Sequence, residues 1–155
     1  MVSIGAVIVE PGLKRTFYGQ TAPVTTQWDP AALAISNTTR EQHLLYPYPE
    51  YTIPSFVEWV ERNTSHYRPT FISDNPAFDW QWVNYYCHRY IGRNPFGHSA
   101  RRLGDFYAGL KGDFFDTRFG HMVKTKHTHH PVDDAKGVAE ALLAMSQKHG
   151  FKLPD

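Results

Sequence analysis

The sequence predicts an α/β fold, in which a mixed sheet is flanked by helices. Residues 2–9 form a continuous run of β-branched and small residues, which is typical of a buried strand. A second apolar segment, residues 70–73, lies between two stretches with helical periodicity, and strands that alternate with helices favour an α/β layer. The chain has 155 residues and no internal repeats, so we expect one domain spanning residues 1–155.

Composition restricts the class of protein. Hydrophobic residues make up 41% of the chain and charged residues 20%, the balance of a globular protein with a packed core. The net charge of +1 argues against a surface that attracts duplex DNA as a whole, although a nucleic-acid enzyme needs only a local basic rim. Cys87 is the single cysteine, which excludes a disulfide framework within the chain. No apolar run approaches the roughly 18–20 residues of a membrane span, and the first residues lack a secretory signal. We therefore expect a cytoplasmic protein with no membrane partner.

The first half of the chain predicts a hairpin followed by helices. The strand at residues 2–9 is followed by a turn signal at residues 10–12 and a second strand at residues 14–19, and the two strands should pair antiparallel. Asp29 is the expected cap of the next segment, and Pro30 occupies its first helical position. The expected helices of this half are residues 30–36, 39–45 and 53–63.

The second half predicts a strand between helices. Residues 70–73 form the strand, Asn75 is the expected N-cap of the following helix, and Pro76 is its first residue. Gly92 ends that helix, because glycine readily adopts the left-handed conformation of a helix C-cap. The other expected elements are helices at residues 76–90, 101–110 and 133–149, a loop at residues 93–99 and an irregular polar segment at residues 112–130.

The last third of the chain brings histidines and aspartates together. His127, His129 and His130 precede two aspartates at the start of the last expected helix. We expect His129 on the incoming loop and Asp134 in the first helical turn, where the helix dipole favours the ionised carboxylate. An ionised carboxylate is a hard ligand for a divalent metal ion, and a nearby imidazole can take a proton from water.

Two other interpretations of the three histidines stay open at this point. Taken without Asp79 and Asp134, they are more simply solvated side chains on a loop, although together they offer imidazole nitrogens of the kind that bind Zn²⁺. The hydrolase pattern His-x-His-x-Asp-His is not matched, because Pro131 and Val132 stand where its acid and last histidine should be. A single-zinc hydrolase is therefore the weakest of the functions considered, and tight zinc binding would identify it.

A second group of candidate residues follows the strand at residues 70–73. Asp79 lies about one turn into the next helix, near the carboxyl end of that strand, where ligands of α/β sheets bind. Taken alone, Asp79 is more simply an ordinary acid in the first turn of a helix. Trp80 belongs either to the core or to a surface on which a base can stack.

Together these residues resemble the second and third motifs of the DEDDh 3′–5′ exonucleases. The resemblance lies in Asn-x-x-Phe-Asp at residues 75–79, which follows a strand, and His-x-x-x-x-Asp at residues 129–134, which opens a C-terminal helix. It is closer still to a small phage and bacterial 3′–5′ exoribonuclease-like branch, and it covers nearly the whole chain. Similarity to that branch is found at residues 2–7, 73–80, 94–99 and 127–135.

The resemblance implies an RNase H-like fold and hydrolysis of phosphodiester bonds with two Mg²⁺ or Mn²⁺ ions. Asp79 would be the metal ligand of the second motif and Asp134 that of the third. His129 would be the general base that takes a proton from the attacking water. The neighbours His130 and Asp133 receive no catalytic role.

One departure from the family pattern concerns the start of the chain. Family members carry an Asp-x-Glu pair of metal ligands on the strand before the one matched by residues 2–7, and no such pair occurs near the N-terminus here. The strand that carries this pair in the family is absent as well. In the family that strand pairs with both predicted strands, so we expect unpaired backbone groups along residues 2–9 and 70–73. Three explanations are open: a fragment or misassigned start, which we favour, a strand from another chain, or the loss of catalysis. The exposed strand edges also favour a homodimer.

The expected partner is the 3′ end of single-stranded RNA or DNA. Asn75, Trp80, His98 and Arg101 are the candidate substrate-binding residues, because basic and aromatic side chains can track a single strand. Each of them is equally an ordinary surface or core residue when taken singly. No motif distinguishes RNA from DNA, since that choice depends on contacts to the 2′-hydroxyl. The alternative function is a non-catalytic nucleotide- or nucleic-acid-binding module derived from such an enzyme.

Overall fold

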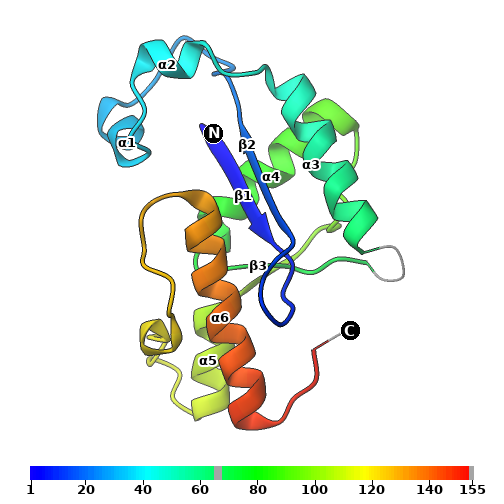
Figure 1. Ribbon diagram of the computed structural model, residues 1–155, viewed down its shortest axis with the longest axis vertical. Helices are drawn as coiled ribbons and strands as arrows, with labels where there is room; N and C mark the ends of the chain where they lie inside the picture. Colours follow the sequence, from blue (N-terminus) through cyan, green and yellow to red (C-terminus); the bar gives the residue numbers. More distant parts are fainter. Residues whose placement is uncertain (65–67, 154–155) are drawn as a thin grey trace.

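A computed structural model describes residues 1–64 and 68–153 as strands packed among helices (Figure 1). The chain opens with a hairpin of β1 (Ser3–Val7) and β2 (Thr16–Gln20), which pair antiparallel. The predicted hairpin is therefore confirmed, with strands that start and end within two residues of the expected bounds.

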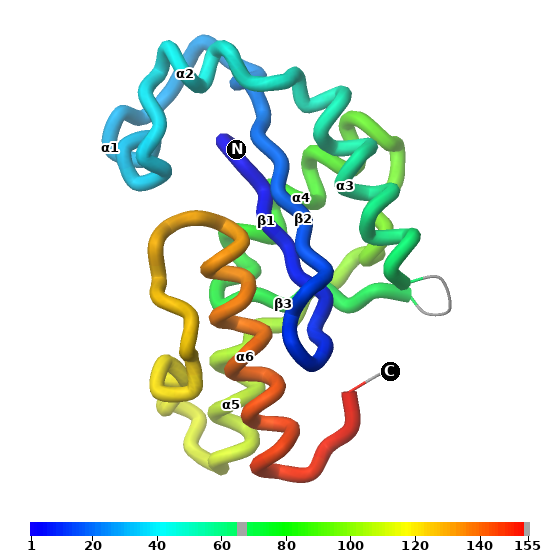
Figure 2. The backbone as a smooth tube through the Cα atoms, viewed as in Figure 1, coloured from blue at the N-terminus to red at the C-terminus, as the bar shows by residue number. Residues whose placement is uncertain are grey.

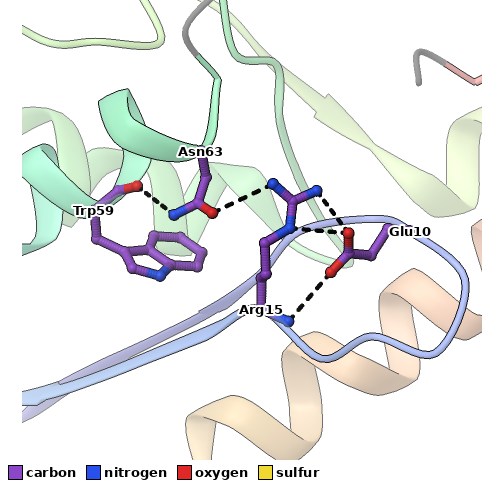
Figure 3. Close-up of polar contacts among 4 residues, drawn as sticks. All are labelled: Glu10, Arg15, Trp59 and Asn63. Atoms are coloured by element: carbon purple, nitrogen blue, oxygen red, sulfur yellow. Dashed lines mark hydrogen bonds and ion pairs between the residues drawn. The ribbon is translucent and has the colours of Figure 1, made fainter.

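A chain of polar contacts ties the turn of this hairpin to the end of helix α3 (Pro49–Asn63), as Figure 3 shows. Arg15 Nη2 lies 2.6 Å from Glu10 Oε2, and Arg15 lowers the pKa of the Glu10 carboxyl through this hydrogen bond. Arg15 Nη1 donates to Asn63 Oδ1 at 3.3 Å, and Asn63 Nδ2 donates to the carbonyl of Trp59 at 2.7 Å. Exposed ion pairs stabilise a fold little, so these contacts orient the turn more than they stabilise it.

Two short helices, α1 (Pro30–Ile35) and α2 (Arg40–Leu44), begin where side chains cap them. Asp29 Oδ1 accepts hydrogen bonds from the first turn of α1, as its sequence position predicted. Thr39 Oγ1 accepts from Gln42 N at 3.2 Å, while Gln42 Oε1 accepts from Thr39 N at 2.9 Å. This reciprocal pair is a capping box, which satisfies two backbone donors that the helix leaves free.

Helix α3 (Pro49–Asn63) begins earlier than the start predicted at residue 53. Pro49 occupies the first helical position, where its fixed φ suits the helix and its missing N–H has no partner to lose. Pro54 lies inside the helix and removes only the hydrogen bond to the carbonyl of Glu50. Both prolines therefore lie within the first two turns of the helix.

The middle of the chain contains β3 (Phe71–Ser73), α4 (Pro76–Ile91), β4 (Ala100–Arg102) and α5 (Leu103–Lys111). The strand β3 and the helix α4 are confirmed. The helix predicted at residues 101–110 is wrong at its start, because its first two residues belong to β4, which pairs parallel with β3. The pairing of β4 with β3 joins residues far apart in the sequence. Such contacts override the helical preference of a segment as short as β4.

The described residues form two separate two-stranded ladders, β1–β2 and β3–β4. The expected α/β layering is present, but within residues 1–64 and 68–153 the two ladders do not join into one continuous sheet. In this part of the chain β1 and β3 are each paired along one side only, which agrees with the predicted unpaired backbone groups. Helix α6 (Pro131–His149) packs on β1 and also contacts β3, so it bridges the two ladders.

Helix α6 approaches β1 most closely at Gly5. A Cβ atom on Gly5 would lie 2.3 Å from the carbonyl carbon of Pro131 and 2.5 Å from the nitrogen of Val132, so no side chain fits there. The glycine therefore sets the first turn of α6 directly against the strand, and this contact determines where the histidine-rich segment enters the helix.

The hydrophobic core has two parts. One lies among the hairpin, α3 and α4, and the other lies between α5 and α6, which run side by side (Figure 1). Cys87 is buried in the first part, and burial raises the pKa of its thiol to about 11, so the thiol is inert. In the described ranges no helix is both long enough and apolar enough to cross a bilayer. The buried residues are Ile4, Ile53, Phe56, Val57, Val60, Val83, Tyr86, Cys87 and Phe96 in the first part, and Leu103, Tyr107, Ala141, Leu142 and Met145 in the second.

Candidate active site

Residues 123–130, here called the histidine loop, lead from the short 3₁₀ helix η1 (Gly120–Met122) to the start of α6 (Figure 2). Helix α6 begins at Pro131, two residues before the predicted start. The backbone N–H of Asp134 donates to the carbonyl of His130 at 3.1 Å, so Asp134 lies in the first turn as expected. The N-terminal end of the helix dipole favours the ionised form of a carboxylate at this position.

Glu140 on α6 anchors the first half of the histidine loop. Its Oε2 accepts from the backbone N–H groups of Lys124 and Thr125 at 2.7 and 2.8 Å, and its Oε1 accepts from Thr125 Oγ1 at 2.8 Å. Burial raises the pKa of Glu140, but these hydrogen bonds outweigh it and the pKa is lowered. Sequence analysis missed Glu140, because an acid in the middle of an amphipathic helix carries no signal of a loop contact.

The second half of the histidine loop is held by Thr128. Its Oγ1 donates to Asp133 Oδ2 at 2.8 Å and accepts from the backbone N–H of His130 at 3.2 Å. Between these contacts His129 adopts a φ of +62°, in the left-handed region that costs a side-chain-bearing residue on the order of 1–3 kcal/mol. Asp133 therefore has a structural role, and the strained residue is the predicted general base.

His127, His129 and Asp134 converge at the start of α6. One ligand atom from each lies within 4.8 Å of the others, and His127 Nδ1 is 2.8 Å from Asp134 Oδ1. His130 packs instead against Tyr18 of β2, with ring centroids 4.7 Å apart and the rings tilted by 31°. The histidine cluster that could bind zinc is thus reduced to two imidazoles and one carboxylate.

Asp79 lies in the first turn of α4, directly after β3. Burial raises the pKa of its carboxyl, the nearby Ser73 hydroxyl opposes this, and the charges of Asp74 and Asp134 raise the pKa further. Asp79 on α4 and Asp134 on α6 are thus close enough for the charge of Asp134 to raise the pKa of Asp79. Asn75 occupies the N-cap position of α4, but its exposed side chain makes no capping hydrogen bond.

The other predicted substrate-binding residues lie around α4. Trp80 is half-buried, and its ring packs on Phe71 and Phe96 with centroids 5.3 and 6.2 Å away. His98 is exposed on the loop after α4, and Arg101 is exposed on β4. Their contact with a nucleic acid stays a prediction, and that of Trp80 is limited to the part of its ring that the core leaves free.

A small cavity of about 200 Å³ opens beside the histidine loop. It is walled on one side by His129 and His130 and on the other by the turn between α1 and α2, where Asn37 also has a positive φ of +50°. Sequence analysis did not identify this wall, because the α1–α2 turn comes close to the loop only in the folded chain. The lining residues are Val2, Ser3, Tyr18, Gln20, Ser36, Asn37, Thr38, Thr128, His129, His130 and Pro131.

The geometry suits hard divalent cations. Asp79 and Asp134 offer carboxylate oxygens, the ligands that Mg²⁺ and Mn²⁺ prefer. Asp134 Oδ1 is buried and has no hydrogen-bond partner among the described residues, so this oxygen is free to bind an ion. An imidazole beside such an ion can accept a proton from water.

Comparison with known proteins finds relatives of this chain in sequence and in fold. A scan against protein-family models finds no match. The 3′-5′ DNA exonuclease Cap18 of Escherichia coli is 30% identical over 149 residues, which cover 90% of this chain and 79% of that protein. The nuclease domain of 3′hExo, a DEDDh family member bound to rAMP, has a TM-score of 0.77 at 15% identity and covers 99% of this chain and 84% of its own.

Two further solved structures share the fold. A full-length 3′-exonuclease has a TM-score of 0.73 at 16% identity, covering 96% of this chain and 72% of that one. A 3′-exonuclease that recognises a histone mRNA stem-loop has a TM-score of 0.73 at 15% identity, and the match covers 95% of this chain and 56% of that one. The structural likeness shows an RNase H-like fold, and the similarity to the curated relative spans most of both chains. The chain therefore belongs to the DEDDh-type 3′–5′ exonucleases of the RNase H-like superfamily.

Proposed function

We propose that this protein removes nucleotides from the 3′ ends of single-stranded nucleic acid, and that Asp79 and Asp134 bind the metal ions and His129 acts as general base. The observation that carries the proposal is the convergence of the Asp134 carboxylate with His127 and with the strained imidazole of His129, and the charge of Asp134 also raises the pKa of Asp79. Strain of this kind persists where the surrounding structure holds a functional residue in place.

The donor set fits two Mg²⁺ or Mn²⁺ ions in a complete site. Asp134 presents a buried oxygen without a hydrogen-bond partner in the described part of the chain, and the Asp79 carboxyl is half-buried and repelled by Asp134. A cation between two such carboxylates relieves their repulsion. When bound, divalent ions supply charge stabilisation to the phosphate and to the leaving 3′ oxygen.

His129 would accept the proton of the attacking water. Its side chain is exposed at the end of the histidine loop, next to Asp134, so the imidazole reaches both the ligand site and solvent. The hydrogen bonds of Thr128 on one side and the start of α6 on the other hold its backbone. The imidazole can therefore take a proton near the metal ligands and release it to bulk water.

Activity is the decisive test of this proposal. The family pattern contains an Asp-x-Glu pair of metal ligands in addition to the aspartates that Asp79 and Asp134 match. A non-catalytic binding module with the same two carboxylates would bind nucleic acid without shortening it. Catalysis and binding alone are thus distinguished by the products of a single assay.

Single-stranded DNA is the first substrate to test, because the relative at 30% identity is named as a DNA exonuclease. RNA is the second, because two proteins of the same fold were solved with rAMP and a histone mRNA stem-loop. Asn75, Trp80, His98 and Arg101 are proposed to contact the strand. A substrate with a single 2′-hydroxyl at its 3′ end would show whether that group is read.

The test is the degradation of 5′-labelled single-stranded DNA and RNA in Mn²⁺ by the wild type and by Asp134→Asn. We expect a ladder that shortens from the 3′ end with the wild type and none with the variant. Asp105→Asn is the matched control, since Asp105 is an exposed acid in the first turn of another helix. Binding of the strand without cleavage by the wild type would contradict the proposal in favour of the binding module.

A further inference from the structure

His127 is the one member of the convergent group that the proposed mechanism does not use. Its Nδ1 lies 2.8 Å from Asp134 Oδ1, yet that oxygen has no hydrogen-bond partner among the described residues. The two atoms are therefore close without the geometry of a hydrogen bond.

The spacing matches two neighbouring ligands of one ion. In an octahedral shell with metal–ligand distances of about 2.1 Å, adjacent ligand atoms lie about 3 Å apart. The corresponding atoms of His127 and Asp134 are separated by nearly this distance. The His127 side chain is exposed, with 65% of its surface accessible, so its ring can adjust to an ion without repacking the core.

The backbone on both sides of His127 is fixed. Glu140 holds Thr125 two residues before it, and the Thr128–Asp133 hydrogen bond holds the residue after it. Both anchors are on α6, the helix that carries Asp134. The loop is thus tied to the ligand-bearing helix at both ends of the short segment that presents His127.

The geometry points to His127 as a ligand of the same divalent ion that Asp134 binds, an assignment that rests on the proposed function. His129, whose ring is 4.3 Å from that of His127 at 74°, keeps the role in proton transfer. An imidazole nitrogen suits transition metals better than it suits Mg²⁺, whereas carboxylate oxygens suit both. A mixed nitrogen and oxygen site therefore favours Mn²⁺ over Mg²⁺.

The test uses Mn²⁺ as the probe and electron paramagnetic resonance as the readout, on the full chain without substrate. We expect the wild type to bind Mn²⁺ and to show electron spin echo modulation from a directly bound ¹⁴N nucleus. His127→Gln should lose the nitrogen modulation. Its ratio of Mn²⁺ affinity to Mg²⁺ affinity should fall by about tenfold or more. His129→Gln should keep the modulation, and His149→Gln, an exposed histidine at the far end of α6, should change neither property.

The outcomes separate this inference from the proposed function. Nitrogen modulation that persists in His127→Gln, or that disappears only in His129→Gln, would overturn the assignment and leave the exonuclease proposal intact. Mn²⁺ binding that is unaffected by Asp134→Asn would contradict the proposed metal site, and the assignment of His127 would fall with it. Equal far-ultraviolet circular dichroism and melting of the variants would show that a lost signal reflects a lost ligand and not unfolding.

Discussion

The two helices that carry the candidate carboxylates start alike and are held differently. Both α4 and α6 have proline at the first position and aspartate in the first turn, and at neither start does an N-cap side chain make a capping hydrogen bond. The start of α6 is tied by polar contacts, through Glu140 and Thr128, and by the close approach to Gly5. The start of α4 rests on aromatic packing around Trp80.

In the proposed site, the two halves would therefore have different tasks. Polar contacts fix the α6 half with a strained His129, so the imidazoles and Asp134 are placed before any ion binds. The α4 half holds Asp79 half-buried next to other acids, where its charge is unfavourable until a cation arrives. We expect substitutions in the α6 half to displace the histidines and Asp134. We expect substitution of Asp79 to relieve its repulsion by neighbouring acids.

His129→Gly, in the α6 half, should have the largest effect on the cleavage rate. Loss of a general base should lower the cleavage rate by roughly two to four orders of magnitude. The same change should raise the free energy of unfolding by about 1 kcal/mol relative to His129→Ala, because glycine adopts the φ of +62° without strain. Single-turnover kinetics and urea unfolding measure the two quantities, and an Ala variant as stable as the Gly variant would contradict the strain.

Gly5→Ala should prevent the close packing of α6 against β1. The added Cβ would collide with the backbone of Pro131 and Val132, which cannot rotate away, so we expect a loss of about 3 kcal/mol in the free energy of unfolding. Gly109→Ala is the matched control, since a Cβ there would have no atom within 4 Å beyond its chain neighbours and the backbone of its own helix. Urea unfolding compares the two variants, and a Gly5→Ala protein as stable as the wild type would refute the close contact.

Glu140→Ala should loosen the histidine loop and leave α4 unchanged. It removes three hydrogen bonds to a carboxylate, and we expect a loss of about 2 kcal/mol in the free energy of unfolding together with weaker Mn²⁺ binding. Glu50→Ala, an exposed acid in the first turn of α3, should change stability by less than about 0.5 kcal/mol. Amide hydrogen exchange should increase at Lys124 and Thr125 in Glu140→Ala alone.

Asp79→Asn should give the smallest change in thermal stability, and this change should be a gain. The folded-state pKa of Asp79 is raised, chiefly by burial, so the ionised group opposes folding above its unfolded pKa and this cost disappears as the pH falls. The metal-free variant should therefore melt at a higher temperature than the wild type near pH 7, and the gain should vanish toward pH 4. Added Mn²⁺ should reverse the order, and a variant that melts lower at every pH would contradict the repulsion.

The sequence by itself determined the local elements and where the candidate residues lie within them. Proline at the first helical position, glycine at C-caps and the run of β-branched residues act within a few residues, and so they placed β1, α4, α6, Asp79, His129 and Asp134 correctly along the chain. These signals are local because they depend on backbone preference and periodicity. For the same reason Pro49 could not be told from a loop proline without the rest of α3.

Only the tertiary structure decided which side chains meet. The partners of Glu140, the choice of His127 over His130 beside Asp134, and the pairing of β4 with β3 all join residues brought together by folding. The separation of the strands into two ladders bridged by α6 is of the same kind. Neighbouring histidines look equivalent in a sequence, but the positive φ of His129 and the anchors on α6 turn them to different faces, because backbone geometry and long-range hydrogen bonds set side-chain direction.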